Sequence, residues 1–186
     1  MIREYQLGER PPMTDLMAWN ADATRMPYRM HSEYLRWLFL DNDLAEGRFT
    51  AAGRPVALTD IRVPIFAVGT LRDHVAPWRS TYKIHLLSDA EMTYLLTSGG
   101  HNAGIVSEPG HDGRSFQVRT KNAEDHYVDP DTFAAQVPRK NGSWWPEWAG
   151  WLHTRSGAPV APPAIGAAES GHPPLGDAPG KYVLEP

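Results

Sequence analysis

Two short apolar segments, each followed by a polar loop, restrict the folds open to this chain. Residues 63–68 (VPIFAV) and 92–97 (MTYLLT) are apolar at nearly every position, which is typical of strands buried on both faces in parallel sheets. Between them, residues 76–87 carry large apolar side chains four positions apart, as a helix would. The pattern strand, loop, helix, strand predicts a βαβ unit with a right-handed crossover.

Two parallel strands cannot cover their own faces and edges, so we expect them to form one side of a larger sheet. Residues 115–119 (SFQVR) are a candidate for one further short strand. The length of 186 residues suits one domain. The expected fold class is therefore α/β, with part of a mostly parallel sheet and flanking helices.

The rest of the chain contains further helix and loop signals. The expected elements are an amphipathic helix over 30–44 with Ser32 as its N-cap, a hairpin or extended arm over 46–58, a short helix over 129–137 capped by Asp129, and a helix over 143–153 with Trp145, Trp148 and Trp151 on one face. The Pro-, Ala- and Gly-rich stretch from 156 onward predicts a tail that lies on the surface or is mobile.

Composition excludes several classes of function. A net charge of −4 with scattered Lys and Arg argues against nucleic acid as a partner. The absence of cysteine excludes disulfides, thiolate zinc sites and a thiol nucleophile in this chain. The charged opening does not resemble a secretory signal, and the apolar runs are too short to span a bilayer, so we expect a cytoplasmic protein.

Candidate catalytic residues follow the two predicted strands. Asp73 and His101 each come a few residues after a strand end, and the carboxyl edge of such sheets is where ligand sites lie. In α/β hydrolases the catalytic residues follow in the chain order nucleophile, acid, histidine. Asp73 and His101, on successive strand-end loops, match the last two of these. The carboxylate would orient the imidazole, and Gly99 and Gly100 would let the loop turn sharply.

Structural interpretations of these residues remain open. An aspartate after a strand is often a turn or helix-capping residue, and a histidine after two glycines is often simply solvated. We interpret His74 as structural. The other histidines lack close ligand spacing with acidic partners, so a metal site is not expected; they are His31, His85, His111, His126, His153 and His172.

Five motifs in order resemble those of polyhydroxyalkanoate synthases. They are WNADATRMP (19–27), VGTLRDHVAPW (68–78), SGGHNAGI (98–105), NGSWWPEWAGWL (141–152) and GDAPGKYVLEP (176–186). Those enzymes are similar to α/β hydrolases with a cap over the site, and they polymerise 3-hydroxyacyl groups from coenzyme A thioesters, releasing coenzyme A. By motif, Asp73 and His101 match the family's triad acid and base, whereas the family's cysteine, in a G-x-C-x-G turn, has no counterpart here.

The resemblance implies the C-terminal portion of such an enzyme, of the class that acts on short acyl chains. It implies part of the cap at 1–58, the C-terminal part of the core at 59–155 and a tail at 156–186. We expect no cofactor, no activity from the chain alone, a cytoplasmic location with granule association, and a possible homodimer. Alternatives are an esterase or depolymerase fragment and a non-catalytic module that binds granules or a partner. Whether Asp73 or His101 would activate the incoming hydroxyl stays open.

Overall fold

The computed structural model describes residues 6–8, 17, 19 and 25–177. These fall into two compact units, one made of residues 1–32 and 159–186 and the other of residues 33–158. The second unit contains the sheet and both predicted catalytic residues. Most of the motif at 19–27 and of the closing motif at 176–186 lies outside the described residues.

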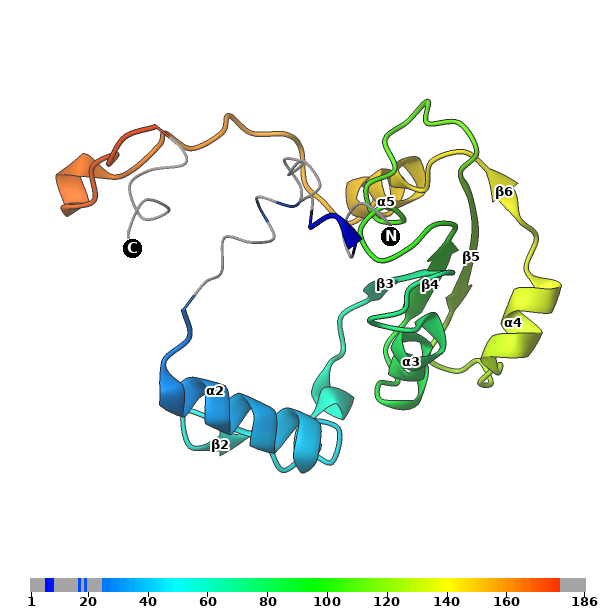
Figure 1. Cartoon of the computed structure of the whole chain (residues 1–186), viewed down its shortest axis with the longest axis horizontal. Helices are drawn as coiled ribbons and strands as arrows, with labels where there is room; N and C mark the ends of the chain where they lie inside the picture. Colours follow the sequence, from blue (N-terminus) through cyan, green and yellow to red (C-terminus); the bar gives the residue numbers. More distant parts are fainter. Residues whose placement is uncertain (1–5, 9–16, 18, 20–24, 178–186) are drawn as a thin grey trace. The chain divides into compact units, whose positions relative to one another are not determined.

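The larger unit is built on a four-stranded sheet in the order β3-β4-β5-β6 (Figure 1). Its strands are β3 (Ile65–Thr70), β4 (Met92–Thr97), β5 (Ser115–Lys121) and β6 (Lys140–Asn141). The parallel pairing of β3 with β4 confirms the predicted parallel pair. The prediction of a mostly parallel sheet is wrong for the described residues, because β5 and β6 both pair antiparallel. After β4 the chain turns through a loop rather than a crossover helix, so it re-enters the sheet in the opposite direction.

Strand β4 is the centre of the core. All six of its residues are buried, and successive side chains point to opposite faces of the sheet. On one face, Tyr94 and Leu96 pack with Trp78, Tyr82 and Phe133. On the other face, Leu95 packs with Phe116 and Trp144. The sheet therefore has a core on both sides, as the apolar run predicted.

Short helices cover these two faces. The first core contains residues of α3 (Trp78–Thr81), of the 3-10 helix η4 (Tyr82–Leu86) and of α4 (Pro130–Gln136). Helix α5 (Trp145–His153) lies on the other face, where Trp151 contacts Phe66 of β3 edge to face. The predicted helices at 76–87, 129–137 and 143–153 are thus confirmed, and Asp129 caps α4 by accepting from the backbone N–H groups of Asp131 and Thr132.

The segment before the sheet differs from its prediction. Residues 30–44 were expected to form one amphipathic helix, but α2 (Tyr28–Tyr34) continues as a π-helix, η2 (Leu35–Leu40), and neither contains a buried residue. Ser32 lies inside α2 and is not its N-cap. An apolar stripe is buried only where another element packs against it, and in the described chain Trp37 meets Phe49 while Phe39 and Leu40 stay exposed.

The remaining elements are short. The hairpin alternative at 46–58 is confirmed, with β1 (Thr50–Ala51) antiparallel to β2 (Arg54–Pro55), followed by the 3-10 helix η3 (Leu58–Asp60). In the smaller unit, residues 159–177 are all exposed and carry one 3-10 turn, η5 (Ala168–Ser170). This exposure agrees with the predicted surface position of the tail.

Candidate active site

The structure brings Asp73 and His101 together at the carboxyl ends of β3 and β4. The Nδ1 atom of His101 lies 3.1 Å from Oδ1 and 3.0 Å from Oδ2 of Asp73. The two residues are separated by 28 positions in the sequence, and the parallel register of the two strands places their loops side by side. The predicted pairing of the two side chains is therefore present.

The carboxylate of Asp73 is held in place by its own loop. Its Oδ1 atom accepts hydrogen bonds from the backbone N–H groups of Val75 and Ala76, both at 2.9 Å, and Thr70 Oγ1 donates to Oδ2 at 3.3 Å. The Ala76 N–H bond is the main cause that holds the pKa of Asp73 well below its usual range; burial opposes it, and the His101 bond adds to it. Asp73 is therefore a charged, fixed acceptor.

The imidazole of His101 is oriented on one side and open on the other. When the ring is neutral, Nδ1–H donates to the Asp73 carboxylate, which leaves Nε2 as a proton acceptor. The side chain of His101 is 45% exposed, whereas that of Asp73 is 8% exposed. The arrangement therefore has a largely shielded carboxylate that sets the tautomer and a partly exposed imidazole that can take a proton.

The loop that carries His101 is shaped by glycine. Gly99 has φ +106°, a value that side chains rarely adopt, and a Cβ there would lie 2.8 Å from the Cα of Gly104. The backbone N–H of Gly104 donates to the carbonyl of Gly100 and closes the turn around His101. The prediction that this glycine pair allows a sharp turn holds at Gly99, but Gly100 does not have a positive φ.

The loops that carry Asp73 and His101 are also in direct contact. The N–H groups of Leu71 and Arg72 donate to the carbonyls of Thr97 and Gly99, both at 2.8 Å, so the ladder between β3 and β4 continues into the loops. A Cβ at Gly104 would lie 2.6 Å from Thr70 Cγ2. The position of His101 relative to Asp73 is therefore set by backbone contacts as well as by their hydrogen bond.

Two tryptophans hold the far side of the histidine loop. Trp144 Nε1–H donates to the carbonyl of Gly104 at 3.1 Å, and Trp145 Nε1–H donates to the carbonyl of Ile105 at 2.9 Å. Trp144 is buried, although the predicted helical stripe of Trp145, Trp148 and Trp151 did not include it. The sequence signal for this role is the adjacent tryptophan pair at the start of α5. The contact itself joins residues 40 positions apart and so depends on the fold.

The other candidate metal ligands of the described chain do not lie close together. Among the described residues, no three or more His, Asp or Glu side chains are placed to hold a metal ion. His74 is exposed next to Asp73, and His111 pairs only with Glu108 at 2.9 Å on the surface. Within the described parts of the chain, no helix has the length and apolarity needed to span a membrane.

The fold and the site together define an α/β protein with an Asp–His pair at the carboxyl edge of two parallel strands. The sequence is similar to those of several poly(3-hydroxyalkanoate) polymerases. The chain is 33% identical to poly(3-hydroxyalkanoate) polymerase 2 of Ectopseudomonas oleovorans, 37% to the poly(3-hydroxyalkanoate) polymerase of Methylorubrum extorquens and 34% to the polymerase subunit PhaC of Cupriavidus necator, in each case over 98% of its length.

The predicted resemblance is thus confirmed: the chain is homologous to poly(3-hydroxyalkanoate) polymerases. It spans about a third of the length of these relatives, between 29% and 32% of each. No protein-family model matches the chain.

Proposed function

We propose that this chain supplies the acid and the base of a polyhydroxyalkanoate synthase, and that the cysteine nucleophile lies on polypeptide outside this sequence. The contact between Asp73 and His101 carries the proposal, because it is the acid–base half of a nucleophile–His–Asp triad. The absence of cysteine and the coverage of about a third of each relative fit this division. The names of the relatives favour polymerisation over ester hydrolysis.

The fold that we propose for the whole enzyme is an α/β hydrolase. In the described chain β3 pairs only with β4, so its other edge has free backbone groups that a strand of the missing polypeptide would fill. Residues 59–155 would then be the C-terminal part of the core, 1–58 part of the cap and 156–186 a tail. An acid after one strand and a histidine after the next agree with the order of that fold.

The proposed reaction starts with proton transfer to His101 Nε2. The imidazole takes the proton of the cysteine thiol, and the thiolate attacks the carbonyl carbon of a 3-hydroxyacyl coenzyme A thioester. When the tetrahedral intermediate collapses, the C–S bond to coenzyme A breaks and the imidazolium returns its proton to the leaving thiolate. Asp73 stays charged and stabilises the imidazolium. The product is an acyl-enzyme and free coenzyme A, with no cofactor required.

Elongation needs a base for the 3-hydroxyl group that attacks an acyl thioester. We propose His101 for this step too. Both oxygens of Asp73 already accept hydrogen bonds, its side chain is 8% exposed, and its lowered pKa makes it a weak base. His101 Nε2 is the accessible acceptor of the pair.

The test is a chimaera in which this chain replaces its counterpart in the Cupriavidus necator polymerase, assayed for coenzyme A release from 3-hydroxybutyryl-CoA. We expect turnover in the chimaera and none from the chain alone. His101→Gln should abolish turnover, and the matched change His74→Gln on the adjacent exposed histidine should leave it unchanged. Full activity in His101→Gln would overturn the proposal.

Product analysis separates the enzyme alternatives. Polymer on the growing chain supports the synthase, whereas free 3-hydroxybutyrate as the main product would indicate an esterase or depolymerase. The assay also addresses substrate chain length, since the same chimaera can be offered longer 3-hydroxyacyl thioesters. We propose a preference for short acyl chains.

The expected partners are a second subunit and the polyester granule. Phe39 and Leu40 are 69% and 74% exposed on η2, which provides an apolar surface for such a contact. Co-sedimentation of the chain with purified granules tests this association. Replacing both residues by serine should reduce it, while the exposed change Arg54→Gln should not.

A further inference from the structure

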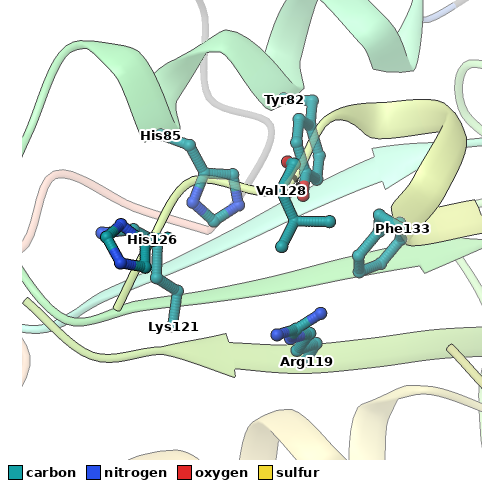
Figure 2. A pocket seen from close by; sticks show the side chains of 7 residues that line it. All are labelled: Tyr82, His85, Arg119, Lys121, His126, Val128 and Phe133. Atoms are coloured by element: carbon teal, nitrogen blue, oxygen red, sulfur yellow. Dashed lines mark hydrogen bonds between the residues drawn. The ribbon is translucent and has the colours of Figure 1, made fainter. Parts of the chain in front are cut away.

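A depression at the amino end of β4 is lined by cationic and aromatic side chains (Figure 2). The depression is open to solvent, and the empty space in and above it, open solvent included, is about 290 Å³. Arg119 and Lys121 enter it from β5, Tyr82 and His85 from η4, and His126 from the connection to α4. Figure 2 shows these side chains facing one space, with the two cations on the strand side and Tyr82 and His85 on the helix side.

The strand register explains why the two cations share this space. Alternate residues of a strand point to the same face, so Arg119 and Lys121 project together. Arg119 pairs with Tyr94 across the ladder, and Tyr94 belongs to the aromatic core with Tyr82 and Phe133. The two cations therefore stand at the rim of an aromatic cluster.

The two cations have no paired carboxylate among the described residues. Neither Arg119 nor Lys121 forms an ion pair with any described residue, and Lys121 Nζ donates only to the backbone carbonyl of Asn122 at 3.3 Å. The two aspartates of this region are already engaged. Asp129 accepts from the first turn of α4, and Asp125 accepts from the N–H of Asn122 at 2.8 Å.

The imidazole of His85 lacks hydrogen-bond partners. Both of its ring nitrogens are shielded from solvent and have no acceptor or donor in the described structure. Burial, followed by the positive charges of Lys121 and Arg119, lowers the pKa of His85 to about 4. A neutral ring keeps one N–H to donate, and buried N–H groups are rarely left unpaired. Tyr82 is not available, because its hydroxyl donates to the carbonyl of Val128.

We propose that this pocket binds a phosphate group, held by Arg119 and Lys121 and by an N–H of His85. The donors come from β5 and η4 and point into one space. A carboxylate ligand has only two acceptor oxygens for them, whereas a phosphate has three or four. Arg119 can donate two parallel hydrogen bonds to one phosphate, and Lys121 adds a point charge. The rings of Tyr82 and Phe133, which are 3% and 1% exposed, close the floor of the pocket.

This site is separate from the proposed active site and does not rest on the proposed function. Lys121 pairs with Met92, the first residue of β4, whereas Asp73 and His101 follow the other ends of β3 and β4. Failure of one proposal therefore leaves the other standing.

The test follows the histidine ring signals of the 186-residue chain by NMR while inorganic phosphate is added at constant ionic strength. We expect a saturable shift of the His85 signals and a rise in the pKa of His85, because a bound anion stabilises the imidazolium. The groups that face this ring are Lys121 and Arg119, whose charges act on it, and Tyr82 and Tyr94, whose rings contact it; His126 lines the same pocket.

Variants distinguish specific binding from general screening. Arg119→Gln should weaken phosphate binding about tenfold, which corresponds to the loss of a charge-assisted hydrogen bond. Arg119→Lys should retain part of it, and the control Arg54→Gln, an exposed arginine on β2, should leave it unchanged. A shift of equal size in Arg119→Gln and the parent chain, or a shift linear in phosphate, would overturn the proposal.

A second probe identifies the source of the phosphate group. Phenyl phosphate that binds more tightly than inorganic phosphate would support an organic phosphate as the ligand. Equal affinities would support a free phosphate ion. If Arg119→Gln does not fold, the comparison between the parent chain and Lys121→Gln decides in the same way, with severalfold weaker binding expected.

Discussion

The two ends of β4 carry polar groups in opposite states. At its carboxyl end, Asp73 accepts hydrogen bonds from two backbone N–H groups and a hydroxyl and also contacts His101. Near its amino end, the ring nitrogens of His85 have no hydrogen-bond partner, and Arg119 forms no ion pair with a described residue. A group whose partners are supplied by the fold is oriented before any ligand arrives, whereas a group without partners requires a ligand to complete it. The difference separates a preorganised acid–base pair from a proposed anion site.

The largest effect that we expect concerns the carboxyl end of β4, where Asp73 orients His101. Asp73→Asn in the chimaera keeps the side-chain shape but removes the charge that sets the His101 tautomer. We expect coenzyme A release to fall by about 10³- to 10⁴-fold, by analogy with triads in other enzymes. Single-turnover assays of acyl-enzyme formation measure this directly. A loss smaller than about tenfold would contradict the assigned role.

The contact between the loops that carry Asp73 and His101 predicts the next effect. Gly104→Ala would place a Cβ 2.6 Å from Thr70 Cγ2 and 2.8 Å from the Gly100 carbonyl oxygen. We expect a loss of about 1–3 kcal/mol in unfolding free energy, typical of overpacking, and reduced turnover as His101 moves. Urea unfolding and the coenzyme A assay check both. Gly157→Ala, where a Cβ meets nothing within 4 Å, is the control.

A matched pair of substitutions tests the tryptophans behind the histidine loop. Trp144→Phe removes the buried donor to the Gly104 carbonyl, and Trp145→Phe removes the donor to the Ile105 carbonyl. Trp144 is 5% exposed, so its loss should cost about 1–3 kcal/mol of unfolding free energy. The Trp145 change should cost less, because water can replace a donor near the surface. Equal losses in urea unfolding would contradict this ranking.

The smallest effect that we expect is the pH dependence of folding stability caused by His85, near the amino end of β4. The pKa of His85 is lowered to about 4 in the folded chain, so between that pH and the ordinary value near 6.5 the unfolded chain binds more protons. Folding stability should therefore fall as pH drops from about 7 to 4, by roughly 1–2 kcal/mol after allowing for screening of a half-buried ring.

His85→Leu provides the comparison for that pH effect. Without the imidazole, the part of the pH dependence between about 6.5 and 4 that belongs to this group should vanish. Urea unfolding at several pH values, with the parent chain alongside, measures it. An unchanged pH profile would show that the ring is solvated in the folded chain.

The sequence predicted the contact between Asp73 and His101 because its signals are local. The apolar run of β4 and the loops that follow the two strands place Asp73 and His101 by strand geometry alone. The helix cap at Asp129 was likewise predictable, since an aspartate before a proline is a strong helix start.

The features that the sequence did not predict depend on contacts between distant segments, which no short sequence pattern reveals. The antiparallel direction of β5 follows from the path of a loop, so the sheet was predicted as mostly parallel. The two cations of the pocket come to lie beside Tyr82 and His85 only once β5 is in register with β4. The hydrogen bonds of Trp144 and Trp145 join segments 40 residues apart. The exposed helix over Tyr28–Leu40 shows that an apolar stripe does not reveal where its partner surface is.

The close approach of Thr70 and Gly104 has a consequence for how such chains can diverge. The hydroxyl of Thr70 reaches Asp73, while its methyl group fills the space that a side chain at 104 would need. A Cβ at 104 would also lie 2.8 Å from the Gly100 carbonyl oxygen, so a smaller residue at 70 would not make room for one. Glycine at 104 is therefore expected to persist across the family's history, whatever residue stands at 70.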